Sequence, residues 1–210
     1  EQFAALELQR NNIEGLITMV GDHRVYPYGP LFAHLTGYVG RVSKKDLARD
    51  DDPTLSIATA KIGKTGIEAG FDKRLRGAHG LREIEVDALG KEIRALANRE
   101  AKPGDAITMT LDIQTQRKAM TLLGQEAGSI CVIDCRNGDI LALASTPSFD
   151  PNAFVGGIDQ DTWNALRDHE QTPLLNKSVR GLFSPGSTFK GIVLAAALAE
   201  GLIDERTQIY

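Results

Sequence analysis

An almost uninterrupted apolar run over residues 189–198 constrains the fold of this chain more than any other stretch. Pro185 and Gly186 break the chain just before the run, and Gly201 follows it where a helix C-terminus usually has a glycine. A helix that is apolar on all sides is expected in the centre of a domain, not on its surface. The sequence therefore predicts a buried helix that is entered through a sharp turn.

Ser187 and Lys190 stand at the entrance of this helix, three residues apart and therefore on one helical face. The serine has a simple structural interpretation, because its hydroxyl can cap free backbone N–H groups. The lysine has none, since its ammonium meets the positive end of the helix dipole and loses hydration on burial. Both effects favour the neutral amine, which can accept a proton from a serine hydroxyl. We predict a nucleophile and its base; a surface helix with Lys190 in water would contradict this.

The S-x-x-K spacing is a weak signal by itself, and its surroundings carry more information. Residues 173–177 read P-L-L-N-K and residues 184–190 read S-P-G-S-T-F-K. This pattern resembles the active-serine segment of class B penicillin-binding proteins, most of all the members that act in cell elongation. Ser184 stands where that family often has a second proline. Residues 26–39 and 145–152 also resemble the family, in the segment leading into its N-terminal module and in the S-x-P-x-[YF]-D-P-N segment after its first hairpin.

The resemblance implies an α+β fold with two parts. Residues 1–112 would form a small β-rich, non-catalytic pedestal module of the dimerisation type. Residues 113–210 would form the first part of a penicillin-binding transpeptidase domain, a serine β-lactamase-like α/β sandwich. The boundary is placed near Asp112, where short strands give way to a helix followed by a hairpin.

The resemblance also implies an activity, a set of partners and a location. Ser187 would attack the penultimate D-Ala of a peptidoglycan stem peptide, Lys190 would take its proton, and β-lactams would acylate the same serine. The implied partners are stem peptides, β-lactams, the SEDS glycosyltransferase RodA and the scaffold protein MreC. No cofactor or metal is implied. The protein would lie on the periplasmic face of the bacterial inner membrane, held by an anchor outside this chain.

Two further motifs of the family, S-x-N and a K-T-G on a later strand, do not occur between Lys190 and Tyr210. We therefore expect this chain to be a fragment with little or no transpeptidase activity alone. Lys64-Thr65-Gly66 spells K-T-G but precedes Ser187 by over a hundred residues, so we reject it as the catalytic copy.

Two alternatives stay open. One is another serine penicillin-recognising enzyme, a DD-carboxypeptidase or a β-lactamase, although those enzymes lack a pedestal. The other is a non-catalytic scaffold module in which Ser187 and Lys190 are inert. The net charge of −4 argues against a nucleic-acid partner, and no apolar run is long enough to span a bilayer. Cys131 and Cys135 are predicted too far apart for a disulfide and lack a nearby histidine for zinc.

The remaining patterns predict local structure. We expect His34 to be a structural residue, Cys131 a core residue and Cys135 a turn residue. The hairpin strands at 128–134 and 139–145 are apolar on both faces, so helices should cover both sides. The other predictions are helices at 2–11, 44–49 (capped by Ser43), 113–123 (capped by Asp112) and 159–167, strands at 13–20, 82–87, 92–96 and 106–111, and a solvated acidic loop at 50–53.

Overall fold

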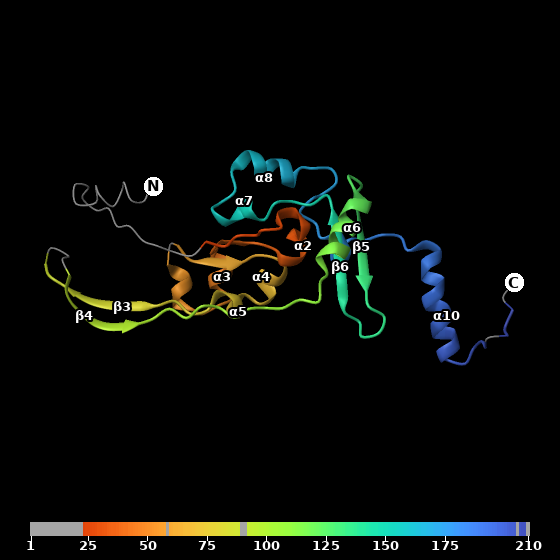
Figure 1. Ribbon diagram of the computed structural model, residues 1–210, viewed down its shortest axis with the longest axis horizontal. Coiled ribbons are helices and arrows are strands. Elements are labelled where there is room, and N and C mark those ends of the chain that lie inside the picture. The colour runs from red at the N-terminus through yellow and green to blue at the C-terminus, as the bar shows by residue number, and fades with distance from the viewer. Residues whose placement is uncertain (1–22, 58, 89–91, 205, 209–210) are drawn as a thin grey trace.

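The computed structural model describes residues 23–210, except positions 58, 89–91, 205 and 209–210. The predicted helix at 2–11 and strand at 13–20 lie outside the described residues. Helices and short antiparallel strands are mixed along the chain, as the α+β expectation required. In Figure 1 the arrangement is elongated, with the hairpin of β3 and β4 at one end and helix α10 at the other.

The first part of the chain is built from short elements around one small sheet, in which β1 pairs antiparallel with β2. Ser43 caps α3 in a capping box with Asp46, which confirms the predicted cap, although the helix ends before residue 49. The elements are η2 (Gly29–Leu31), α2 (Ala33–Thr36), β1 (Val39–Arg41), α3 (Lys44–Leu47), η3 (Pro53–Ser56), β2 (Lys61–Gly63), α4 (Gly66–Gly70) and α5 (Asp72–Arg76).

A two-stranded ribbon follows, formed by β3 (Leu81–Val86) and β4 (Glu92–Arg99). The predicted antiparallel pairing of these strands is confirmed, with register shifts after Glu83 and Glu85. The strand predicted at 106–111 is wrong. This segment instead runs beside β6, where it makes single hydrogen bonds from Thr110 and Asp112 to the carbonyls of Ile140 and Leu141, too few to form a ladder.

The second part begins with helix α6 and the hairpin of β5 and β6. Asp112 caps α6 by accepting a hydrogen bond from the Thr115 N–H at 2.7 Å, and a turn containing Asn137-Gly138 joins the strands, so both predictions are confirmed. The helix predicted at 159–167 is α8, capped by Asp159. The elements are α6 (Ile113–Leu123), β5 (Gly128–Ile133), β6 (Ile140–Thr146), α7 (Asn152–Val155), α8 (Gln160–Arg167), α9 (Lys177–Arg180), η4 (Gly186–Thr188) and α10 (Phe189–Ala199).

Only one face of the β5–β6 hairpin is fully covered in the described part of the chain. Helix α6 packs Ala119 onto Ala142 and Ala144, and Ile130 and Val132 join this cluster. Because side chains alternate along a strand, Cys131 points to the other face, where it is exposed. The predictions of helices over both faces and of a core role for Cys131 are therefore wrong. Cys135 lies in the turn as predicted, and both cysteines are free.

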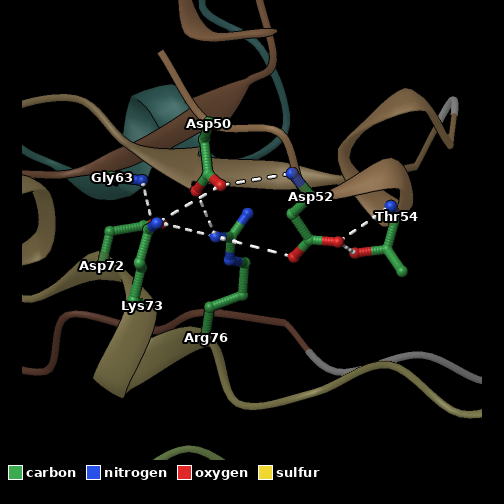
Figure 2. A network of polar contacts seen from close by, with 7 residues as sticks. All are labelled: Asp50, Asp52, Thr54, Gly63, Asp72, Lys73 and Arg76. Atoms are coloured by element: carbon green, nitrogen blue, oxygen red, sulfur yellow. Dashed lines mark hydrogen bonds and ion pairs between the residues drawn. The ribbon is translucent and has the colours of Figure 1, made fainter.

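The predicted solvated acidic loop holds for Asp51 and Pro53, which are exposed, but is wrong for Asp50 and Asp52, whose carboxylates face Arg76. Figure 2 shows them around the guanidinium of Arg76, whose side chain is 9% exposed. Arg76 Nη2 lies 2.8 Å from Asp50 and 3.4 Å from Asp72, and Asp72 accepts a hydrogen bond from the Gly63 N–H. The hydrogen bond from Arg76 lowers the pKa of Asp50. The partner that organises this loop lies 26 residues away, so local sequence does not reveal it.

One buried side chain joins the two parts of the chain. Gln116 of α6 is 1% exposed, and its amide nitrogen donates to the carbonyls of Leu31 at 2.9 Å and Leu143 at 3.2 Å. Its amide oxygen accepts from the Leu143 N–H at 2.8 Å. Asn152 of α7 adds a paired contact, accepting from the Tyr26 N–H and donating to the Tyr26 carbonyl. Residues 26–31 are thereby held on α6, β6 and α7.

Replacing Arg76 with methionine is expected to destabilise the fold by about 2 kcal/mol, because three partly buried carboxylates lose their shared cation. The folded-state pKa of Asp50 lies below its unfolded value, so its stabilising effect is present above about pH 4 and is lost on acidification. The variant should therefore lose less stability than the wild type as the pH falls below 4. Urea denaturation between pH 3 and 7 measures both effects. The exposed Arg74→Met is the control, and equal acid sensitivity of wild type and R76M would contradict the network.

Replacing Gln116 with leucine is expected to destabilise the fold by about 2–3 kcal/mol, because the carbonyls of Leu31 and Leu143 and the Leu143 N–H would lose their partner in a buried place. Gln114→Leu changes the same residue type two positions earlier, on the exposed side of α6, and should cost under about 0.5 kcal/mol. Urea denaturation of the two variants compares them directly. If Q116L were as stable as Q114L, the contact between the two parts of the chain would not depend on the Gln116 carboxamide.

Candidate active site

Ser187 and Lys190 lie on one continuous helical stretch. Ser187 is in the middle of η4, and α10 begins two residues later at Phe189. Gly186 enters this stretch with φ +54°, a left-handed conformation that glycine adopts without strain. The two residues therefore lie on the same side of the helix, about one turn apart, as the S-x-x-K spacing predicts.

The C-terminus of α10 is also as predicted. Gly201 has φ +68° and follows the C-cap Glu200. The N–H of Leu202 donates to the carbonyl of Ala197 at 2.9 Å, and that of Gly201 to Leu198 at 3.1 Å. This pair of hydrogen bonds is a Schellman motif, which ends a helix on a glycine.

The hydroxyl of Ser187 does not cap the helix. The N-cap of α10 is Thr188, and no side chain makes a capping hydrogen bond there. The hydroxyl of Thr188 instead donates to the carbonyl of Pro185. Among the described residues, neither Ser187 nor Lys190 has a side-chain hydrogen bond or ion pair. Capping, the structural explanation for a serine at this place, is thus excluded for Ser187.

The prediction that α10 is buried is wrong for the described part of the chain. No residue of the helix is buried, and Ile192 is 64% exposed. Figure 1 shows α10 set apart from α6, β5 and β6, joined to them by the segment 181–185. An all-round apolar helix needs cover on several sides, and the described elements supply none. Lys190 is exposed as well. Taken by itself, the described chain therefore shows the outcome stated above as contradicting the nucleophile and base prediction, a surface helix with an exposed lysine.

Three consecutive residues anchor the segment that leads to Ser187. Asn176 donates from its amide nitrogen to the carbonyl of His34 at 3.0 Å, and its amide oxygen caps α9. Ser178 donates from its hydroxyl to the carbonyl of Ala144 at 2.8 Å. Between them, the N–H of Lys177 donates to the hydroxyl oxygen of Ser145 at 3.0 Å. The start of α9 is therefore fixed to α2 and to β6.

Lys177 is a buried cation that the sequence did not single out. Its exposed fraction is 6%, and its ammonium donates to the carbonyl of Thr172 at 3.1 Å. Among the described residues no carboxylate pairs with it, and burial lowers its pKa. A lone lysine after an asparagine usually lies on the surface, so composition gives no signal for its burial. Only its position inside the active-serine resemblance could have drawn attention to it.

The other polar residues that the sequence raised have structural roles. His34 lies 3.4 Å from the carbonyl of Pro147 and packs edge-on against Phe149, which confirms the structural interpretation. Lys64 of the rejected K-T-G pairs with Asp46. Within the described ranges, no group of three or more His, Cys, Asp or Glu side chains is arranged to hold a metal ion.

Comparisons with known proteins cover both parts of the chain. The family model of the penicillin-binding protein dimerisation domain matches residues 1–109, and that of the penicillin-binding protein transpeptidase domain matches residues 128–210. The peptidoglycan D,D-transpeptidase MrdA of Escherichia coli K12 is 37% identical over the whole chain, which covers 34% of that protein. The MrdA of Acinetobacter baumannii is 40% identical over 89% of the chain and 28% of that protein. The chain thus spans about a third of the length of these curated relatives.

Two solved structures share this arrangement. Penicillin-binding protein 2 of Helicobacter pylori in complex with MreC has a TM-score of 0.81 and 35% identity, over 99% of this chain and 38% of that one. Penicillin-binding protein 2 of Pseudomonas aeruginosa in complex with WCK 5153 has a TM-score of 0.76 and 34% identity, over 92% of this chain and 39% of that one.

Proposed function

This chain belongs to the penicillin-binding proteins, and on that premise we propose that it is part of an elongation-type peptidoglycan D,D-transpeptidase in which Ser187 is the nucleophile and Lys190 its base. The observation that carries the proposal is the helical turn bearing Ser187, whose hydroxyl caps nothing, one turn before Lys190. This turn lies inside the residues that match the transpeptidase domain.

The reaction is an acyl transfer. The Ser187 hydroxyl oxygen attacks the carbonyl of the penultimate D-Ala of a stem peptide while the neutral amine of Lys190 takes the hydroxyl proton. The carbon–nitrogen bond to the terminal D-Ala breaks, and the leaving nitrogen takes the proton that Lys190 accepted, which restores the neutral lysine. An amine of a second stem peptide then attacks the ester and releases Ser187. The N–H of Ser187, at a helix N-terminus, is suited to stabilise the negative oxygen of the tetrahedral intermediate.

We propose that α10 is covered in the whole protein by parts of the transpeptidase domain outside this chain. The relatives are about three times as long as the chain, which leaves room for such elements. Apolar side chains on several sides of α10 are exposed here, including Ile192, Val193 and Leu198. Their cover would also take Lys190 out of water and so favour its neutral form. The chain alone is therefore expected to have little or no transpeptidase activity.

We propose two domains that meet near Asp112. Residues 1–112 would be the dimerisation-type pedestal and residues 113–210 the start of the transpeptidase domain. The gap between the two matched ranges, 110–127, contains Asp112 and the whole of α6, which supports this boundary. Gln116 then holds the pedestal onto the first strand pair of the transpeptidase domain.

The partners and the location are proposed from the same family. The Helicobacter pylori relative forms a complex with MreC, and we propose MreC as a partner here, together with RodA. Stem peptides and β-lactams are the proposed ligands of Ser187. We place the protein on the periplasmic face of the inner membrane of a bacterium, with an anchor outside the described residues. The described part of the chain contains no helix that could cross a membrane.

The first test is acylation of the full-length protein by a fluorescent penicillin. Ser187→Ala is expected to lower labelling by at least about a thousandfold, because the attacking oxygen is gone. Ser184→Ala changes an exposed serine three residues earlier and should leave labelling within about twofold. Undiminished labelling of S187A would refute the assignment and favour the scaffold alternative. An acyl-enzyme hydrolysed within seconds would indicate a β-lactamase instead.

The second test concerns the base. Lys190→Met is expected to lower the acylation rate constant by about 10²–10⁴-fold, the usual contribution of a positioned proton acceptor. Lys64→Met is the matched control, because it removes an amine from the rejected K-T-G copy and should leave the rate unchanged. Stopped-flow fluorescence with the labelled penicillin gives both rate constants. If K64M abolished acylation and K190M did not, Lys64 and not Lys190 would be the base.

A further inference from the structure

Lys177 lies ten residues before Ser187 and is buried without an acidic partner among the described residues. Burial of an unpaired ammonium costs stability, and a methionine of similar length would fill the same space without that cost. A charge kept in such a place needs a reason beyond packing. The contacts of the Lys177 ammonium and of the Lys177 main chain indicate what that reason is.

The ammonium holds a strained backbone position. It donates to the carbonyl of Thr172, and Thr172 has φ +46°, a left-handed conformation that is strained for a β-branched residue. The same carbonyl accepts the N–H of Leu175, and the Thr172 N–H donates to His169. Lys177 thus closes the turn that brings the chain from α8 to α9.

The main chain around Lys177 is fixed to two other elements. The side chain of Asn176 reaches the carbonyl of His34 on α2, and that of Ser178 reaches the carbonyl of Ala144 on β6. The hydroxyl of Ser145 accepts from the Lys177 N–H and also lies 3.4 Å from the carbonyl of Leu175. We call residues 176–178 the α9 clamp, because together they fix the start of α9 to α2 and to β6.

The chain after the clamp makes few contacts before it reaches Ser187. Leu182 is 99% exposed and Phe183 is 63% exposed. In the described part of the chain, the last anchored point before Ser187 is therefore α9. A displacement there is carried along to the turn that bears Ser187, and a shift of about 1 Å at a reacting atom can cost about a hundredfold in rate.

We propose that Lys177 is a positioning residue for the Ser187 nucleophile, acting through the turn at Thr172 and the α9 clamp. The inference rests on the proposed function of Ser187. Lys177 bonds to Ser145 and Thr172 and not to Ser187, so we expect its effect on the chemical step of acylation and not on the affinity for the penicillin.

The test compares Lys177→Met with Lys177→Arg in the full-length protein, using a fluorescent penicillin at several concentrations. K177M removes the charge and the donor, whereas K177R keeps both. K177M is expected to lower the acylation rate constant about tenfold with an unchanged dissociation constant of the initial complex. K177R should restore the rate to within about threefold of the wild type. Lys45→Met, an exposed lysine on α3, is the surface control.

Loss of stability alone must be separated from loss of position. Leu55→Val creates a small cavity at a buried site in the first part of the chain and lowers stability without touching the clamp. If L55V slows acylation as much as K177M at an equal loss in Tm, the positioning role is refuted. An unchanged rate in K177M, or a loss that K177R does not restore, refutes it as well.

Ser178→Ala provides an independent test of the proposal if K177M does not fold. It removes one hydrogen bond of the clamp and should slow acylation about twofold to fivefold, again without a change in the dissociation constant. A wild-type rate in S178A would then overturn the proposal. Failure of the proposed function looks different, because the wild-type protein itself would not be labelled at Ser187.

Discussion

The carboxamide of Gln116 is the contact on which the arrangement of this chain depends. It satisfies three backbone groups at once, the carbonyl of Leu31 and both the N–H and the carbonyl of Leu143, in a place that water does not reach. An unpaired polar group there would cost more than the hydrogen bond gains. The Leu31 carbonyl, which crosses from the first part of the chain, must therefore meet a carboxamide that β6 already holds in place. The segment 26–31 is thereby fixed beside β6, the strand that also receives the α9 clamp.

Features set by neighbouring residues could be predicted from the sequence. The Asp112 cap, the Ser43 capping box, the Asn137-Gly138 turn and the glycine end of α10 each depend on a few consecutive positions. The hydrogen bonds of these caps and turns join residues only a few positions apart, so the local sequence is enough to specify them. The family resemblance was equally visible, because residues 173–190 carry it in one stretch.

Features set by distant partners could not be predicted. The loop at 50–53 looks solvated because it is acidic, yet Arg76 draws Asp50 and Asp52 inward from α5. Cys131 looks like a core residue because its strand is apolar, but alternation places Ile130 and Val132 on the covered face instead. Lys177 gave no signal, since its burial follows from the turn at Thr172 and from contacts with β6. Each error concerns which side of an element is covered, which local pattern does not specify.

The sequence pattern predicts both a serine and a lysine on one helical face and the burial of that helix. The described chain shows the first without the second. Helical geometry aligns Ser187 with Lys190, and it exists in this chain without any cover over the helix. The proposed role of Lys190 as a base needs that cover as well, because burial is what disfavours a charged amine. The chain thus carries the alignment, and the proposed chemistry requires further surfaces over α10. On the proposed function, such an arrangement would link the reactivity of Ser187 to assembly of the transpeptidase domain, because the exposed helix gives Lys190 no burial.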